Sequence, residues 1–142
     1  GGIRIAAETA QLAAPEVKLG WIGGGGMSAF LAAAAGPSNA AIMTMTGDMI
    51  DAETARRWGI VSEVVAGDRL IPRARELAAI IASRPPIAVE TAKANIRAAY
   101  NLPQEQAVAY ERDLQTVAFA TEDAAEGRRA FAERRDATFA GR

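Results

Sequence analysis

The sequence predicts an α/β protein that is mostly helical by content. Up to about residue 67, short runs rich in β-branched residues alternate with helical patterns, whereas residues 68–142 show apolar residues at helical spacing throughout. Hydrophobic residues make up 50% of the 142 residues but aromatic residues only 6%, and alanine is prominent, which favours closely packed helices over a large aromatic core. We therefore expect two regions, residues 1–67 and 68–142, that form one structural unit overall.

The first region is expected to contain strands over residues 3–6 and 60–65 and helices over residues 28–35, 39–45 and 51–58. Asp51 is a suitable N-cap for the last of these helices, because its short side chain can accept a hydrogen bond from an unpaired backbone N–H group. Gly59 is a suitable residue to end it in a left-handed conformation. Gly47 and Asp48 are expected to close the helix over residues 39–45.

The second region is expected to contain four helices, over residues 70–81, 86–100, from Pro103 onward, and from Thr121 onward. Prolines separate them, because proline is tolerated in the first turn of a helix but not in its interior. Thr121 can cap the fourth helix, whose first turn holds two acidic residues at its favourable end. Gly127 lies inside that helix, where glycine costs roughly 1 kcal/mol relative to alanine, so we expect close packing at this position.

Charge and composition exclude several classes of function. The net charge is −1 with both signs interspersed, so we expect neither a nucleic-acid partner nor binding to an anionic membrane. No segment is apolar for long enough to span a bilayer and no signal peptide is visible. The sequence has no cysteine, which agrees with a cytoplasmic protein, and no histidine, which excludes histidine-based triads and most zinc sites. Acid/base chemistry must therefore use carboxylates, lysine or tyrosine.

One carboxylate stands in a chemically suggestive position. Glu16 precedes a short apolar run and the four-glycine turn Gly23–Gly26, which lies at the expected N-terminus of a helix. Glycine allows the main chain to approach a ligand closely, and a helix N-terminus favours anionic groups. This arrangement suggests acid/base chemistry on an activated acyl group, although a glycine-rich turn is more often only a tight connection.

The chain resembles the enoyl-CoA hydratase/isomerase (crotonase) superfamily over nearly its whole length. The similarity begins with Ile3-Arg4-Ile5-Ala6-Ala7-Glu8 and Pro15-Glu16-Val17-Lys18-Leu19-Gly20, and continues through Met45-Thr46-Gly47-Asp48-Met49-Ile50-Asp51-Ala52 and Ala55-Arg56-Arg57-Trp58-Gly59-Ile60-Val61. It ends in Phe119-Ala120-Thr121-Glu122-Asp123-Ala124-Ala125-Glu126-Gly127 and Ala130-Phe131-Ala132-Glu133-Arg134-Arg135. These segments occur in the family's order.

The resemblance implies a partial crotonase-type ββα spiral followed by C-terminal oligomerisation helices, with trimers or hexamers as the family's habit. It also implies that this chain is similar to the C-terminal half of such proteins. In the family, the N-terminal half supplies both N–H groups of the oxyanion hole and one of two catalytic glutamates. Within these 142 residues, the four-glycine turn is the only plausible source of donors to a thioester oxygen.

The resemblance also assigns candidate site residues. Glu16 matches the family's catalytic glutamate in the segment P-E-x-x-x-G. The acyl thioester would lie near Trp21, Gly24, Gly25, Gly26 and Met27, and CoA would contact Phe131 and Arg134 on the last helix, usually from a neighbouring subunit. The sequence departs from the family pattern where Gly23 replaces a proline, Met27 replaces a small residue, and Ser28-Ala29-Phe30 stands in place of the Thr-Gln-Arg typical of hydratases. These departures make the pocket more apolar. For Trp21 and Met27 the alternative is a place in the core, and for Arg134 a solvated basic helix end.

The function expected from this resemblance is reversible hydration of 2-enoyl-CoA thioesters. Coenzyme A would enter only as part of the substrate, and no metal or redox cofactor is expected. Two alternatives stay open: a related crotonase reaction such as enoyl-CoA isomerisation, or a non-catalytic module that self-associates or binds acyl-CoA.

Overall fold

The computed structural model describes residues 2–142, which separate into two compact units. The first unit extends to Arg75 and the second is Glu76–Arg142, so that helix α3 (Leu70–Ala82) contains the boundary. Each unit is described by itself below. The boundary at residue 67 that the sequence suggests stays a prediction.

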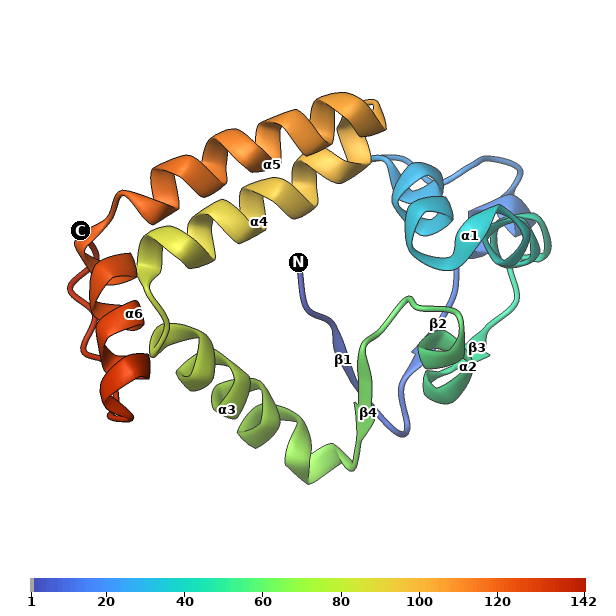
Figure 1. Ribbon diagram of the computed structural model, residues 1–142. Helices are drawn as coiled ribbons and strands as arrows, with labels where there is room; N and C mark the ends of the chain where they lie inside the picture. The colour runs from blue at the N-terminus through green and yellow to red at the C-terminus, as the bar shows by residue number, and fades with distance from the viewer. Residues whose placement is uncertain (1) are drawn as a thin grey trace. The chain divides into compact units, whose positions relative to one another are not determined.

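The first unit contains two small β-sheets with helices between the strands (Figure 1). Its elements in chain order are β1 (Ile5–Ala7), β2 (Gln11–Leu12), the 3-10 helix η1 (Pro15–Leu19), α1 (Met27–Thr46), β3 (Ile50–Asp51), α2 (Ala52–Arg57), β4 (Glu63–Val65) and the 3-10 helix η2 (Gly67–Arg69). Strands β1 and β4 pair in parallel with Ala6 opposite Val64, and β2 pairs antiparallel with β3. The long connection between β1 and β4 is the kind of crossover that parallel pairing requires.

Small side chains form the core of the first unit. Its buried members are Ala6, Ala14, Ala35, Met43, Ala52, Ala55, Ile60 and Val61. Because most of these are alanines, backbones can approach one another closely, as the composition predicts. The expected strands are shorter than predicted: β1 begins at Ile5 and β4 at Glu63, while Ile60 and Val61 are buried in the core ahead of β4.

Helix α2 begins and ends as the sequence predicts. The Thr54 N–H group donates to Asp51 Oδ1 at 2.7 Å, which makes Asp51 the N-cap. Gly59 has a left-handed conformation with φ of 79°, and a Cβ atom there would lie 2.9 Å from the backbone oxygen of Ala34. Glycine is therefore required at this position both for its backbone angle and for the space it leaves.

Helix α1 joins the two helices that the sequence predicts over residues 28–35 and 39–45. It is broken in its interior at Gly36, whose φ of 77° and ψ of 158° are not helical. The cause is Pro37, because proline cannot donate a helical hydrogen bond and disfavours a helical conformation in the residue before it. Gly47 ends the helix in a left-handed conformation, with its N–H group bonded to the carbonyl of Met43.

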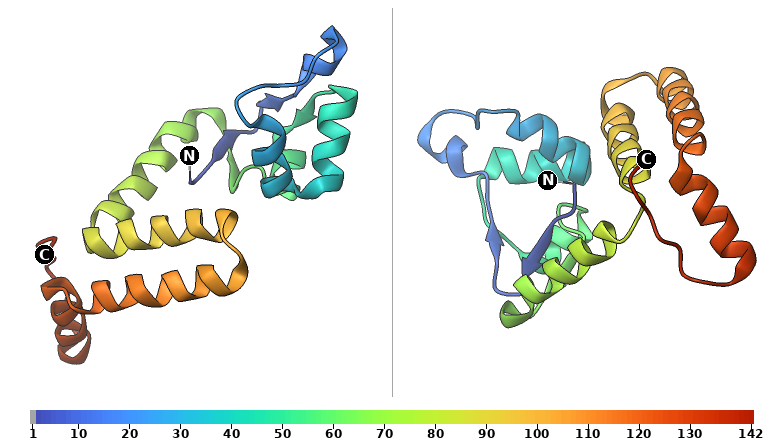
Figure 2. Two further views of the ribbon diagram at one scale, coloured as in Figure 1. Left: turned by 90° about the horizontal axis from the view of Figure 1, so that it is seen from above. Right: turned by 90° about the vertical axis from the view of Figure 1, so that its left-hand side faces the viewer.

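The second unit is helical, with α4 (Pro86–Asn101), α5 (Gln104–Phe119) and α6 (Glu122–Glu133). Helices α4 and α5 form a hairpin whose two arms lie side by side in every view (Figure 2). Thr121 caps α6 as predicted, by accepting a hydrogen bond from the Ala124 N–H group at 3.0 Å. No residue of α4 or α5 is fully buried: Ile87 and Leu114 are half-buried, whereas Ile96 and Val117 are exposed in the described chain.

The predicted close packing at Gly127 is wrong. A Cβ atom added there would meet only the ring of Phe139, at 3.8 Å, which is an ordinary contact. Phe139 belongs to the C-terminal tail, which follows α6 back along its length. In the part of the chain that the structure describes, no helix combines the length and the apolar character needed to cross a membrane.

Candidate functional site

Glu16 lies in η1, a short 3-10 helix that local sequence signals define. Pro15 occupies its first turn, and Gly20 ends it with φ of 89°. The Gly20 and Trp21 N–H groups donate to the carbonyls of Val17 and Glu16 at 3.2 and 3.3 Å. These bonds fix the backbone of Glu16 within a tight, closed turn.

The carboxylate of Glu16 has one buried oxygen without a partner. Its Oε2 atom is buried and has no hydrogen-bond partner among residues 2–142. Buried polar atoms in folded proteins are rarely left without a partner, because an unmade hydrogen bond costs about 1–3 kcal/mol. Such an atom therefore calls for a functional or structural explanation, and a group that accepts or delivers a proton during a reaction provides one.

Met27 and Gly23 complete the immediate surroundings of Glu16. A Cβ atom built on Gly23 would lie 2.1 Å from Met27 Cε, 2.8 Å from Met27 Sδ and 3.4 Å from Glu16 Oε1. The thioether of Met27 thus fills the space that a side chain at position 23 would need, directly beside the carboxylate. The structure brings together the two predicted residues Glu16 and Met27 and adds Gly23 to them.

The four glycines of the turn serve different purposes. Gly26 precedes α1 with φ of 87°, and a Cβ atom on it would lie 2.9 Å from the ring of Phe30. Gly24 and Gly25, in contrast, have no atom within 4 Å of such a Cβ position. The open face of the loop is therefore at Gly24 and Gly25, where an incoming group could approach the main chain.

The predicted contact of Trp21 with an acyl group stays a prediction. Trp21 lies on the segment between Glu16 and the glycine turn, and 59% of its surface is exposed, as is 80% of Ile22 beside it. The alternative reading of Trp21 as a core residue does not fit this exposure. An exposed aromatic surface next to the carboxylate is available to an apolar ligand.

The end of α1 anchors η1, a contact that the sequence does not reveal. Lys18 Nζ forms an ion pair of 2.7 Å with Asp48 Oδ1, just beyond the end of α1. A Cβ atom on the buried Gly47 would lie 3.1 Å from Lys18 Cε and 3.2 Å from Val17 Cγ1. Gly47 therefore lets η1 pack tightly against α1. A glycine that ends a helix gives no signal of which distant segment lies over it.

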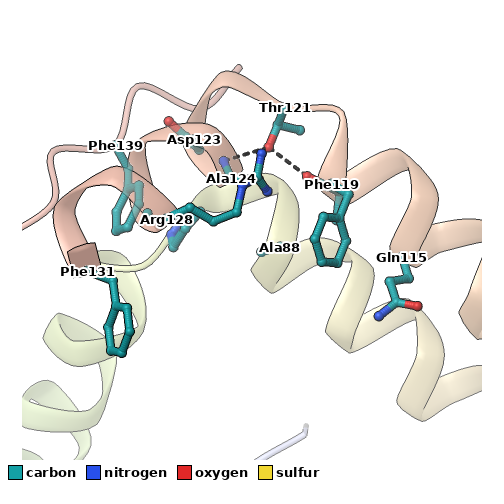
Figure 3. Close-up of a pocket in the computed structure, with 12 residues that line it drawn as sticks. Ala88, Gln115, Phe119, Thr121, Asp123, Ala124, Arg128, Phe131 and Phe139 are labelled. Atoms are coloured by element: carbon teal, nitrogen blue, oxygen red, sulfur yellow. Dashed lines mark hydrogen bonds between the residues drawn. The ribbon is translucent and has the colours of Figure 1, made fainter.

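The second unit holds the other predicted residues. Phe131 projects from α6 with 87% of its surface exposed (Figure 3). Phe131 lines a shallow, largely apolar pocket of about 450 Å³, together with Phe119 and Phe139. The Arg128 guanidinium lies 5.5 Å from the centre of the Phe119 ring, within the range of a cation–π contact.

The basic residues of α6 do not form one uniform cluster. Arg129 and Arg135 both bind Glu126, at 2.6 Å each, and these two arginines together with the Thr138 N–H group hold the pKa of Glu126 well below its usual range. Arg134 ends α6 with φ of 53°, and its side chain forms no ion pair within residues 2–142. Of the arginines near the end of α6, Arg134 therefore remains available to an external anion.

Similarity to solved structures defines the class of protein to which this fold belongs. A crystal structure of enoyl-CoA hydratase from Bacillus anthracis superposes with a TM-score of 0.95 at 34% identity, covering 99% of this chain and 54% of that chain. A structure of enoyl-CoA hydratase from Mycobacterium tuberculosis H37Rv superposes with a TM-score of 0.92 at 30% identity, covering 99% and 56%. The chain thus has the mostly helical α/β architecture of a crotonase-type protein, as predicted.

The family follows from the sequence comparison. The family model described as "Enoyl-CoA hydratase/isomerase" matches residues 2–142, so the chain belongs to the enoyl-CoA hydratase/isomerase family. It is 40% identical over 140 residues to "Probable enoyl-CoA hydratase echA8" of Mycobacterium bovis and 36% identical over 138 residues to "2,3-dehydroadipyl-CoA hydratase" of Escherichia coli. These matches cover 99% and 97% of this chain but 54% of each relative. The chain therefore spans about half the length of the curated relatives it matches.

Proposed function

We propose that this chain carries the acid/base glutamate for reversible hydration of 2-enoyl-CoA thioesters. The observation that carries the proposal is the buried, unpartnered Oε2 of Glu16, which lies in a closed turn beside the Met27 thioether and near the glycine loop. The printed names of the relatives support the same reaction class, since several are hydratases of CoA thioesters.

The chemistry requires one proton to move between water and carbon. The water oxygen forms a bond to C3 of the enoyl group, and a proton is delivered to C2, where the thioester carbonyl makes the carbon electron-rich during the reaction. A carboxyl group can orient the water and transfer the proton when it lies within hydrogen-bond reach. No change of net oxidation level occurs, so the proposal includes no redox cofactor, and it includes no metal.

The loop could contribute a second element. Gly24 and Gly25 expose main chain near the N-terminus of α1, and backbone N–H groups so placed favour the negative charge that develops on a thioester oxygen. In the family, the resemblance implies a second glutamate and two oxyanion donors outside the segments matched here. The proposal for this chain rests on Glu16, with the open main chain at Gly24 and Gly25 as the source of donors within the described residues.

The direct test is loss of the enoyl absorbance of crotonyl-CoA in the presence of the purified chain. Glu16→Gln keeps the size of the side chain but removes its acid/base function, so we expect turnover to fall by about 10²–10⁴-fold. Glu8→Gln, which changes an exposed carboxylate in the same unit, is the matched control and should leave turnover unchanged. A folded chain without turnover, or with equal turnover in both variants, would contradict the proposal.

A second candidate is a non-catalytic acyl-CoA-binding module. The observation that favours it is the pairing of an exposed aromatic ring, Phe131, with an arginine that has no ion pair among the described residues, Arg134. An aromatic face suits a purine ring and a guanidinium suits phosphate. Calorimetric binding of CoA that weakens in Phe131→Ala and Arg134→Ala, without turnover, would support this candidate over the first.

We also propose self-association and a cytoplasmic location. The support for self-association is the exposed apolar surface of the second unit, which includes Ile96, Val108, Val117 and Phe119. Solvent-exposed patches of this kind commonly mark protein interfaces. Light scattering on the purified chain tests the proposal, since a monomer at micromolar concentration would contradict it.

The cytoplasmic location agrees with the absence of cysteine from the sequence.

A further inference from the structure

The thioether of Met27 occupies a defined place beside Glu16. The would-be Cβ of Gly23 lies 2.1 Å from Met27 Cε and 3.4 Å from Glu16 Oε1, so these two atoms are separated by at most the sum of these distances, about 5.5 Å. Met27 is half-buried and packs against the core of the first unit. Methionine is intrinsically flexible, and its contact with the core limits the positions that the side chain can adopt.

The same geometry shows what a side chain at position 23 would displace. No left-handed backbone angle occurs at Gly23, in contrast to Gly25 and Gly26. Glycine is therefore not needed there for its backbone angle, and a side chain at this position would meet the flexible end of Met27. A methyl group at position 23 would not fit unless the Met27 thioether moved away from its position beside Glu16.

We propose that Met27 is a specificity-determining residue of the Glu16 site and restricts it to short, linear 2-enoyl thioesters. This inference rests on the proposed function, since it concerns the substrate of the same carboxylate. A reacting carbon within hydrogen-bond reach of Glu16 would share the surroundings of the carboxylate with the Met27 methyl group, which lies at most about 5.5 Å from Oε1. We expect the Met27 methyl group to accommodate a methyl substituent on the enoyl group and to exclude a phenyl ring on the same carbon.

Proximity can be tested without turnover. The chain contains four methionines, so ¹³C-methyl labelling gives few and assignable signals. The Met27 methyl signal should shift in Glu16→Gln, because the substitution changes the electrostatic surroundings of a methyl group beside the carboxylate. The signal of Met49, which is largely exposed, should not respond to the same substitution. A Met27 signal that ignores Glu16 would overturn the inference.

Specificity is tested by comparing kcat/KM for crotonyl-CoA and cinnamoyl-CoA. Met27→Ala should raise the relative rate for cinnamoyl-CoA by about tenfold or more, since one or a few carbons in an apolar pocket are worth that much discrimination. Met27→Leu has a similar volume and should keep the wild-type ratio. Gly23→Ala, which displaces the Met27 thioether, should alter the ratio of kcat/KM for the two thioesters when Met27 is present. The same substitution should not alter this ratio when it is combined with Met27→Ala.

The outcomes separate the two proposals. If neither thioester is turned over, or if turnover does not depend on Glu16, the proposed function fails and the inference fails with it. If turnover of crotonyl-CoA depends on Glu16 but Met27→Ala leaves the ratio unchanged, only the inference on Met27 is overturned. The inference on Met27 is likewise overturned if Met27→Leu and Met27→Ala change the kcat/KM ratio of the two thioesters equally.

Discussion

Replacement of Asp123 by alanine should release the C-terminal tail from the second unit. Asp123 lies in the first turn of α6 and is 2% exposed, the one charged side chain that is buried in residues 2–142. Its two carboxylate oxygens accept hydrogen bonds from the Ala140 and Gly141 N–H groups at 2.6 and 2.8 Å, and its own N–H group donates to the Arg142 carbonyl at 3.1 Å. Two further contacts join the tail to α6, from Arg142 Nε to Glu122 Oε2 at 2.9 Å and from the Thr138 N–H group to Glu126 Oε1 at 3.3 Å, but both are exposed, and Asp123 supplies the buried part of the attachment.

The size of the effect follows from these contacts. Hydrogen bonds to a charged group contribute about 1.5–3 kcal/mol each to stability. We expect a loss of about 3 kcal/mol, at the low end for two such bonds, because the released tail amides can bond to water. A carboxylate in the first turn also interacts favourably with the helix dipole, so its removal acts in the same direction.

Amide hydrogen exchange measures this effect directly. With about 3 kcal/mol of stabilisation, exchange at Ala140 and Gly141 should be roughly 10²-fold faster in Asp123→Ala than in the wild-type chain, since 1.4 kcal/mol corresponds to a factor of ten. Asp136→Ala, which changes an exposed aspartate of the same tail, is the control and should leave exchange unchanged. Equal exchange at Ala140 and Gly141 in all three proteins would refute the assignment of Asp123 as the residue that binds the tail.

Three further predictions concern single positions in the two units. Gly127→Ala should stabilise the second unit by about 0.5–1 kcal/mol in thermal unfolding, because α6 gains helix propensity and the nearest atom, in Phe139, is at an ordinary distance; a lower melting temperature would contradict this. Gly47→Ala should destabilise the first unit by about 1–2 kcal/mol, because the φ of Gly47 is 67° and a Cβ atom there would press on Lys18. Lys18→Ala should lower the stability by under about 1 kcal/mol, since the ion pair of Lys18 is exposed. Acidification should weaken the second unit: Glu126 has a pKa below its ordinary 4.5, so the stabilisation is present above that value and is lost as pH falls below it. Unfolding of Glu126→Gln should depend less on pH in that range, and an unchanged dependence would contradict the role of Glu126.

Features that depend on neighbours in the sequence were predicted well. The caps of α2 and α6 were found because Asp51 and Thr121 act on N–H groups three residues away. The end of α2 at Gly59 follows from a local backbone requirement as well. The strands were less accurate, because their limits depend on which distant residues pair: Ile5 lies opposite Glu63, and no local signal specifies that register.

The same distinction separates the parts of the candidate site. The position of Glu16 before a glycine turn could be read from the sequence, and so could the exposure of Arg134 near a helix end. The packing of Gly47 against Lys18 could not be read from the sequence. Lys18 and its ion-pair partner Asp48 are 30 positions apart, and nothing local to either segment specifies the other as its neighbour. At Gly127 the local rule suggested a packing reason for glycine, and the tail ring at 3.8 Å shows that packing does not require it.

The glycine turn shows why a motif alone does not define a site. Four consecutive glycines suggest main chain that is open to a ligand, but in the structure Met27 covers Gly23 and Phe30 covers Gly26. Only Gly24 and Gly25 remain open. Two of the glycines therefore accommodate large side chains from the first turn of α1, and one of those side chains lies beside Glu16. The glycines at the centre of the run leave the main chain open to a ligand, and those at its ends leave space for side chains of α1. The packing at Gly23 determines that the Met27 thioether is the apolar group that faces the carboxylate.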